Sequence, residues 1–307
     1  MTSIGFTFGN NKTLEKVTWP STVTEIPDNM FQNCSNLKTV ENVRKVTSIS
    51  SNAFWNCNNL IELNLGSCEI SANAFFCCSK LQSIGESAKC TSVGFQAFDQ
   101  CSSLEKIDLS MCTSVGFSAF AGCSSLQTIG NPKLTSIPDN TFGGCSSLEK
   151  IDLSMCTSVS SDAFYGCKKL QNVNISNCTY IGRKAFNDCS SITEVDLSAC
   201  KSLGDYAFSG CEKLVNVIGL ENFKSIPNLA FSGTALKTLN LPVCTTIGSS
   251  AFSCCSSITE VDLSACKSLG DYAFSDCKKL ANVIGLENFI SIPDYAFRGT
   301  SCVFRAL

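Results

Sequence analysis

Two kinds of side chain in this sequence have the chemistry for a reactive or binding site: thiols and paired carboxylates. The chain has 307 residues, with 22 cysteines and no histidine. Histidine is the commonest general base and the commonest nitrogen ligand for metals, so neither a Ser-His-Asp nor a Cys-His site can be assembled. The sequence also has no other nucleophile motif, and we expect that the protein is not an enzyme.

The carboxylate pairs Glu194/Asp196 and Glu260/Asp262 are each two residues apart. On a strand such residues face the same side, with Cα atoms roughly 6.5–7 Å apart. A glycosidase acid pair falls in this range, but a flat sheet offers no pocket and nothing that raises one pKa. A calcium site is a second alternative, although one repeat supplies too few oxygen ligands. A solvated acidic face is favoured, and calcium or a basic partner stay open.

The cysteines recur at two fixed positions, which is not the arrangement of a disulfide framework. We interpret them as small buried hydrophobes, because in-register disulfides would fit the required dihedral poorly and no C-x-x-C spacing indicates a metal. Eleven follow a repeated phenylalanine by three residues: Cys34, Cys57, Cys78, Cys101, Cys123, Cys145, Cys167, Cys189, Cys211, Cys255 and Cys277. Eight occupy a later turn: Cys68, Cys90, Cys112, Cys156, Cys178, Cys200, Cys244 and Cys266.

These residues belong to a repeat that is clearest in residues 104–123, LEKIDLSMCTSVGFSAFAGC. A fixed period of this length is the signature of a solenoid with one supersecondary unit per repeat. We predict a single solenoid domain over residues 1–307, with about 13 to 14 repeats of 21–23 residues. The sequence is compatible with a fragment of a longer protein. The repeated phenylalanines are Phe8, Phe31, Phe54, Phe75, Phe98, Phe120, Phe142, Phe164, Phe186, Phe208, Phe231, Phe252, Phe274 and Phe297.

Each repeat is predicted to contain one strand and one short turn. In residues 104–109 apolar and charged residues alternate, as in a half-buried strand, and successive strands must be parallel because a crossover joins them. Val115 is expected to point inward after the turn. Residues 116–123 are too short for a stable free helix and predict one helical or 3₁₀ turn. Some repeats carry a glycine or an extra residue after the strand, as in residues 283–289.

The pattern L-x-x-[IVL]-x-L-x-x-C-x-x-[IV]-x-x-x-A-F-x-x-C resembles the BspA-like class of leucine-rich repeats, from about Phe6 to Phe297. The resemblance implies an α/β solenoid: a right-handed, curved coil with a parallel β-sheet on its concave face and short helical or 3₁₀ turns on the convex side. It also implies a surface or secreted adhesion protein, of the kind found in bacteria and anaerobic protozoan parasites, that binds host surfaces or matrix proteins. The class has no catalytic motif.

Charge and hydropathy limit the partners and the cellular locations that the sequence allows. The net charge of -3 and the pI of about 5.2 give no reason to expect nucleic acid as a partner. No apolar run is long enough to span a membrane, and residues 1–10 do not form a signal peptide. The resemblance favours the cell surface or secretion. A cytoplasmic location is the alternative, because reduced cysteines persist there.

Binding residues are expected at the outward strand positions, two and four residues after each repeat leucine. Residues 190–234 and 256–300 are nearly identical, so the same outward residues should recur three repeats apart, about 14 Å along the solenoid. Neither chain end carries a distinctive cap, which predicts possible end-to-end self-association. The predicted binding residues are Glu62, Asn64, Lys106, Asp108, Lys150, Asp152, Asn172, Asn174, Glu194, Asp196, Glu260 and Asp262.

Overall fold

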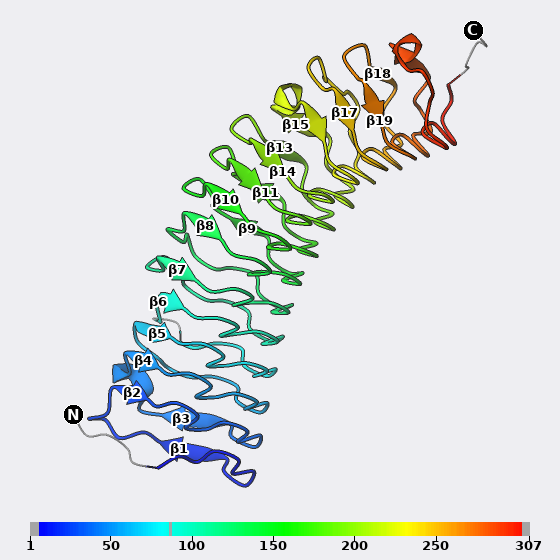
Figure 1. Ribbon diagram of the computed structural model, residues 1–307. Helices are drawn as coiled ribbons and strands as arrows, with labels where there is room; N and C mark the ends of the chain where they lie inside the picture. Colours follow the sequence, from blue (N-terminus) through cyan, green and yellow to red (C-terminus); the bar gives the residue numbers. More distant parts are fainter. Residues whose placement is uncertain (1–5, 86–87, 303–307) are drawn as a thin grey trace. The chain divides into compact units, whose positions relative to one another are not determined.

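The computed structural model describes residues 6–85 and 88–302 of the chain. The chain forms two compact units, Met1–Met155 and Cys156–Leu307. Within each unit the chain winds through successive coils of the predicted length (Figure 1). Most coils contribute two short strand positions, so each unit contains two sets of parallel strands. We call them the first ladder, which follows the repeat leucine, and the second ladder, which follows the turn cysteine.

In the first unit the strands and the 3₁₀-helix have the following bounds. The first ladder contains β1 (Lys16–Thr18), β3 (Thr39–Glu41) and β9 (Lys150–Ile151), with isolated parallel bridges between them at Thr39↔Glu62, Glu62↔Ser83, Lys89↔Asp108 and Lys106↔Thr128. The second ladder contains β2 (Glu25–Ile26), β4 (Ser48–Ile49), β5 (Cys68–Ile70), β6 (Cys90–Val93), β7 (Ser114–Val115) and β8 (Ser136–Ile137). The helix is η1 (Val43–Lys45).

The second unit repeats the same plan. Its first ladder contains β11 (Asn172–Val173), β13 (Glu194–Asp196), β15 (Asn216–Ile218), β18 (Glu260–Asp262) and β20 (Asn282–Ile284). Its second ladder contains β10 (Ser158–Val159), β12 (Tyr180–Ile181), β14 (Ser202–Leu203), β16 (Ser225–Ile226), β17 (Thr246–Ile247) and β19 (Ser268–Leu269). Its 3₁₀-helices are η2 (Leu220–Asn222) and η3 (Leu286–Asn288).

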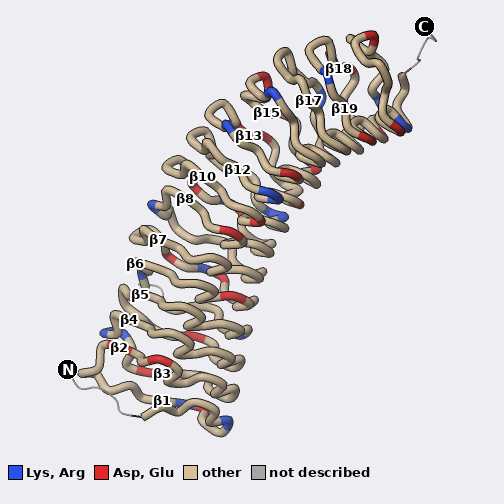
Figure 2. The backbone as a smooth tube through the Cα atoms, viewed as in Figure 1, with Lys and Arg blue, Asp and Glu red and all other residues tan. Residues whose placement is uncertain are grey.

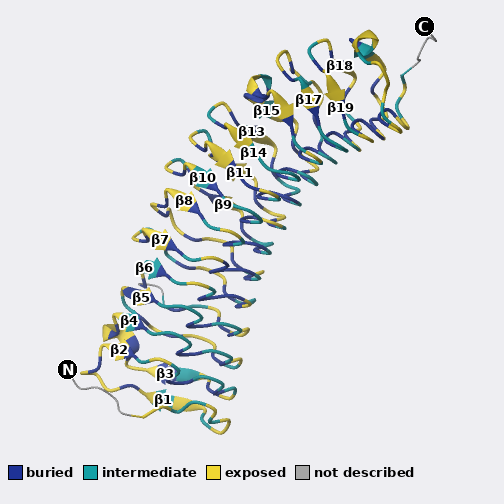
Figure 3. Cartoon of the chain, viewed as in Figure 1, coloured by how far each residue is buried: buried dark blue, intermediate teal, exposed yellow. Residues whose placement is uncertain are grey.

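The predicted alternation along the first strand is confirmed. In β13 the side chain of Val195 is buried, and those of its neighbours Glu194 and Asp196 face outward beside Asn216 and Ile218 of β15. Buried and exposed segments alternate in the same way within the coils (Figure 3). The second ladder is an addition to the prediction, which expected one sheet. Val115 does point inward, but it does so as part of β7, paired with β6.

The phenylalanine ladder forms the core. From Phe31 to Phe274 its members are fully buried, and Phe297 is 7% exposed. Within each unit consecutive rings are stacked, with centroids 5.0 Å apart for Phe75 and Phe98 and 5.8 Å apart for Phe231 and Phe252. Within each unit the coils that carry these buried phenylalanines therefore stack their rings in one column, as the period predicted.

The predicted helical turn at residues 116–123 is wrong in detail. Every second N–H bonds inside the coil, as in Ala121 N to Ser118 O at 3.1 Å, and the others bond to the next coil, as in Phe120 N to Thr141 O at 2.9 Å. This alternation requires left-handed backbone two residues before and after the phenylalanine, at Ser118 (φ 52°) and Gly122 (φ 72°). A 3₁₀-helix would use these groups internally. Among the described residues, helical turns occur only as η1–η3, which follow first-ladder strands.

The buried-hydrophobe interpretation of the cysteines is confirmed, with an added role. All 22 thiols are free and 19 of them are buried. In the phenylalanine-associated column the thiol donates to the carbonyl of the preceding ladder phenylalanine, as from Cys101 Sγ to Phe75 O at 3.0 Å. In the second column five of the eight thiols close the turn, as from Cys112 Sγ to Ser114 O at 3.0 Å, and Cys178 donates to Cys156 O of the preceding coil. The two cysteine columns therefore provide weak S–H donors for backbone carbonyl groups that are buried and cannot bond to water.

Alkylation of the native protein should be confined to three thiols. Cys254 is exposed, and Cys77 and Cys302 are partly exposed. Burial raises the pKa of thiols such as Cys101 and Cys255, that of Cys255 to about 11, so at pH 8 these thiols are protonated as well as inaccessible. Iodoacetamide followed by mass spectrometry should give three adducts natively and 22 after denaturation. The Cys254→Ser variant should give two, and uniform labelling of the native chain would contradict the buried columns.

The predicted self-association depended on the chain ends. Residues 1–5 and 303–307 lie outside the described residues. End-to-end association therefore stays a prediction. No helix in the described part of the chain is long and apolar enough to cross a membrane.

Candidate functional site

The predicted binding residues occupy outward positions of the first ladder in both units. Those in the first unit are Glu62, Asn64, Lys106, Asp108, Lys150 and Asp152, and those in the second are Asn172, Asn174, Glu194, Asp196, Glu260 and Asp262. Charged side chains are dispersed along the coils of both units (Figure 2). The structure brings only Glu62 and Asn64 to the wall of the hollow described next.

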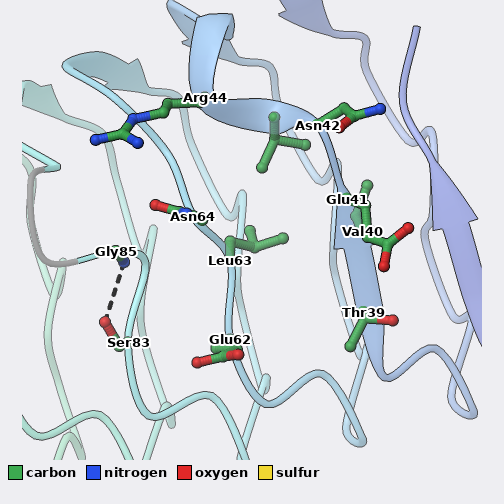
Figure 4. A pocket seen from close by; sticks show the side chains of 11 residues that line it. Thr39, Val40, Glu41, Asn42, Arg44, Glu62, Leu63, Asn64, Ser83 and Gly85 are labelled. Atoms are coloured by element: carbon green, nitrogen blue, oxygen red, sulfur yellow. Dashed lines mark hydrogen bonds between the residues drawn. The ribbon is translucent and has the colours of Figure 1, made fainter. Parts of the chain in front are cut away.

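A hollow of about 700 Å³ opens on the first ladder near the start of the first unit. Figure 4 shows its polar side chains, arranged on three adjacent coils around the buried Leu63. Its lining residues are Thr39, Val40, Glu41, Asn42, Val43, Arg44, Glu62, Leu63, Asn64, Ser83 and Gly85.

A difference between neighbouring coils explains this hollow. After β3, Asn42 adopts left-handed backbone (φ 63°), and the chain turns into η1, which places Arg44 above the ladder. The next coil is shorter and has no such helix. Its Gly66 passes so close that an added Cβ would lie 2.6 Å from the Arg44 carbonyl oxygen. The hollow therefore lies where a coil with a 3₁₀-helix meets a coil without one.

The two carboxylates at the hollow have different environments. Glu41 Oε1 lies 2.6 Å from Lys16 Nζ, and this ammonium group holds the pKa of Glu41 below its ordinary value. For Glu62, on the adjacent coil, the described residues supply no ion-pair partner. Arg44 lies above the ladder near Asn64 (Figure 4). The hollow thus presents one compensated carboxylate, one uncompensated carboxylate and one guanidinium group.

The outward aspartates also have a structural role. The carboxylates of Asp108 and Asp196 each accept the backbone N–H two residues later, Ser110 N and Ser198 N, both at 2.8 Å. Asp152 and Asp262 make the equivalent bond. The bond to Ser110 holds the pKa of Asp108 below its ordinary value. These four carboxylates therefore fix the turn after the strand and leave part of each group for a ligand.

In the second unit the carboxylates Glu194 and Glu260 are each held by the amide of the next coil. Asn216 Nδ2 lies 2.7 Å from Glu194 Oε2, and Asn282 Nδ2 lies 2.5 Å from Glu260 Oε2. This repetition confirms that the near-identical blocks present the same outward residues. Within residues 6–85 and 88–302 no three acidic or cysteine side chains gather as a metal site would require, so calcium binding stays an untested alternative.

Nine of the eleven lining residues were not among the predicted site residues, and three of the nine, Glu41, Asn42 and Arg44, carry charged or amide side chains. The signal was present in the extra residues after the strand, ENVRK, which resemble the longer version of the repeat at residues 283–289. The hollow itself could not be predicted from these residues alone, because it depends on the length difference between two neighbouring coils.

Parallel strand ladders, a buried leucine in each coil and 21–23-residue coils define a leucine-rich repeat solenoid. The family model of the BspA type leucine rich repeat region matches residues 2–127, 91–214 and 179–303. The chain belongs to the BspA-type leucine-rich repeat family. Such repeats are scaffolds that generally serve protein interaction and are typically not enzymes.

Solved structures support the same fold. A leucine-rich repeat protein from Bacteroides ovatus is 22% identical, with a TM-score of 0.64 over 94% of this chain and 77% of that chain. A leucine rich cell surface protein from Faecalibacterium prausnitzii is also 22% identical, with a TM-score of 0.53 over 91% of this chain and 88% of that chain. Among curated proteins no similar sequence was found.

Proposed function

We propose that this protein is a non-enzymatic scaffold that binds a protein partner at a cell surface, through the outward face of the first ladder. The observation that carries the proposal is the hollow at β3 and η1, whose wall carries an uncompensated carboxylate, a guanidinium group and the side-chain amides of Asn42 and Asn64. A shallow polar site of this kind suits recognition of side chains on a partner surface. Host-cell and matrix proteins are the proposed partners, by analogy with the family and with the cell surface protein of Faecalibacterium prausnitzii.

The test is binding of the labelled full chain to host-type cells and to a panel of purified matrix proteins, with and without calcium. Saturable binding that unlabelled protein displaces is the expected result. Absence of binding to every surface would contradict the adhesion proposal. A requirement for calcium would revive the calcium alternative at the acidic strand positions.

Charge reversal at Glu62 should weaken that binding about tenfold, because a basic partner group would meet a like charge in the hollow. Glu69→Lys is the matched control: it makes the same change in the same coil, but Glu69 lies on β5 of the second ladder. Both variants should keep the parent thermal transition, since both side chains are exposed. Equal losses in the two variants would move the site off the hollow.

An intracellular interaction scaffold is the second candidate function. The observation that favours it is that all 22 thiols are free, as expected in a reducing compartment. The thiol state of protein purified from its natural source separates the two candidates. Oxidised Cys254 in that material would favour the cell surface, and fully reduced cysteines would favour the cell interior.

A further inference from the structure

The second unit contains two equivalent grooves that result from the internal duplication. The first groove, of about 810 Å³, is lined by Thr179, Ser198, Ala199, Cys200, Lys201, Ser202, Leu203, Asn222, Phe223, Lys224, Ser225 and Pro227. The second, of about 520 Å³, is lined by Ser264, Ala265, Cys266, Lys267, Ser268, Leu269, Asn288, Phe289, Ile290, Ser291 and Pro293. Eleven positions correspond at an offset of 66 residues.

Each groove lies between the turn after one first-ladder strand and the 3₁₀-helix of the next coil. In the first, the wall before β14 carries Lys201, and the wall after η2 carries Lys224. Gly219 begins η2 in left-handed backbone, φ 85°, and Gly285 begins η3 in the same way. In both copies the walls are formed by the same turn and the same 3₁₀-helix, so the two grooves have the same backbone structure.

The lining is cationic at the rim and apolar below it. Lys201 and Lys224 are exposed on the two walls of the first groove, and Phe223, which also lines it, is buried. In the second groove Lys267 is exposed and Phe289 is half-buried. No acidic residue is among the described residues that line either groove. This local positive charge contrasts with the net charge of -3 of the whole chain. The lysines favour an anionic ligand by charge complementarity. The apolar lining residues favour a ligand that carries an apolar group next to its negative charge.

The internal duplication shows which surface positions have changed. Residues 190–234 and 256–300 differ at seven of their 45 positions, and none of the seven is buried in the first copy. Six of these changes lie outside both grooves. The one change within them replaces Lys224 by Ile290, so the second groove keeps a single lysine, Lys267. The two copies thus form a natural comparison of the same groove with two cations and with one.

We propose that these grooves bind acidic segments of a protein partner, each segment carrying an apolar residue next to Asp or Glu. A peptide fits the spacing of the pair: three coils separate the grooves, about 14 Å. An extended peptide covers that distance in about four residues. One acidic segment with determinants four or five residues apart would therefore reach both grooves, and the first groove binds more strongly because it offers two lysines.

The test is an NMR titration of the full chain with the blocked peptide Glu-Leu-Glu, and with Lys-Leu-Lys as the charge-reversed probe. The amide signals of Ser202 and Ser268 report on the two grooves separately. We expect Glu-Leu-Glu to shift both signals, Lys-Leu-Lys to shift neither, and added salt to weaken binding. Lys224→Ile should weaken binding at Ser202 about two- to fivefold, and Ile290→Lys should strengthen it at Ser268 by a similar factor.

Both substitutions place in one groove the residue that its counterpart already has, so both variants should fold. Equal response to the two peptides, or titrations unchanged by both substitutions, would overturn the proposal. Shifts that appear only with phosphatidylglycerol vesicles would also overturn it and assign the grooves to a lipid surface. Glu62→Lys should leave these titrations unchanged, so failure here and failure of the adhesion proposal are distinguishable.

Discussion

Phe98→Ala should lower the free energy of unfolding by about 3–5 kcal/mol, because it leaves a ring-sized cavity that the stack cannot close. Phe98 is fully buried, and its ring lies 5.0 Å from that of Phe75 and 5.3 Å from that of Phe120. The backbone of this coil is fixed to the next one, for example through Phe98 N to Ala119 O at 2.8 Å. Collapse around the cavity would therefore stretch bonds between coils.

Phe117→Ala is the matched control. Phe117 also stacks, at 5.9 Å from Phe95, but 45% of its surface is exposed. Loss of such an exposed aromatic pair should lower the free energy of unfolding by about 0.5–1.5 kcal/mol. Urea denaturation followed by circular dichroism gives both values. Amide exchange should show the Phe98→Ala loss concentrated in the adjacent coils, since each coil contacts only its neighbours. Equal destabilisation by the two variants would contradict the phenylalanine ladder as the core.

The sequence was sufficient to predict the solenoid because its core residues recur in register. A phenylalanine every 21–23 residues and a leucine or isoleucine before each first-ladder strand fix which side chains lie inside, and the structure confirms both. The outward positions of Glu194 and Asp196 followed from the same register and are also confirmed. Whether these positions bind a ligand is a separate question, which the period does not address.

The turn around each phenylalanine could not be predicted from local pattern. Two residues after the phenylalanine, glycine, asparagine and aspartate are frequent, as these residues tolerate left-handed backbone. Two residues before it, Gln96, Lys184, Tyr206 and Leu229 also adopt this backbone, and none of their side chains favours it. Hydrogen bonds to the next coil impose this backbone, so tertiary contacts override the local preference for φ below zero. A single repeat read alone therefore resembles a helical turn.

The hollow and the grooves escaped prediction for a related reason. Each depends on two coils of unequal shape, as where η1 lies beside the shorter coil that contains Gly66. Periodicity describes what the coils share, whereas binding sites arise here where neighbouring coils differ. The sequence shows which repeats have extra residues. It does not show which residues of the neighbouring coil these extra residues lie against.

Gly219→Ala should be a strongly destabilising substitution in the second unit. Its φ of 85° costs a residue with a side chain about 1–2 kcal/mol. In addition, a Cβ would lie 2.5 Å from Ser198 N and 2.7 Å from Leu197 C, both backbone atoms of the preceding coil. Overpacking against backbone adds about 1–3 kcal/mol, so the total loss should be about 2–5 kcal/mol.

Gly233→Ala separates the two contributions. Gly233 has a similar φ of 73°, but the nearest atoms to an added Cβ lie 3.8 Å away. This variant should lose only the conformational part, about 1–2 kcal/mol. The difference between the two variants in urea denaturation measures the close approach of η2 to the preceding coil. Because that approach forms the wall of the first groove, Gly219→Ala should also abolish the Glu-Leu-Glu response at Ser202, while Gly233→Ala keeps it. Equal losses of stability would show that the coils can separate at this point, and the groove would then have no fixed wall.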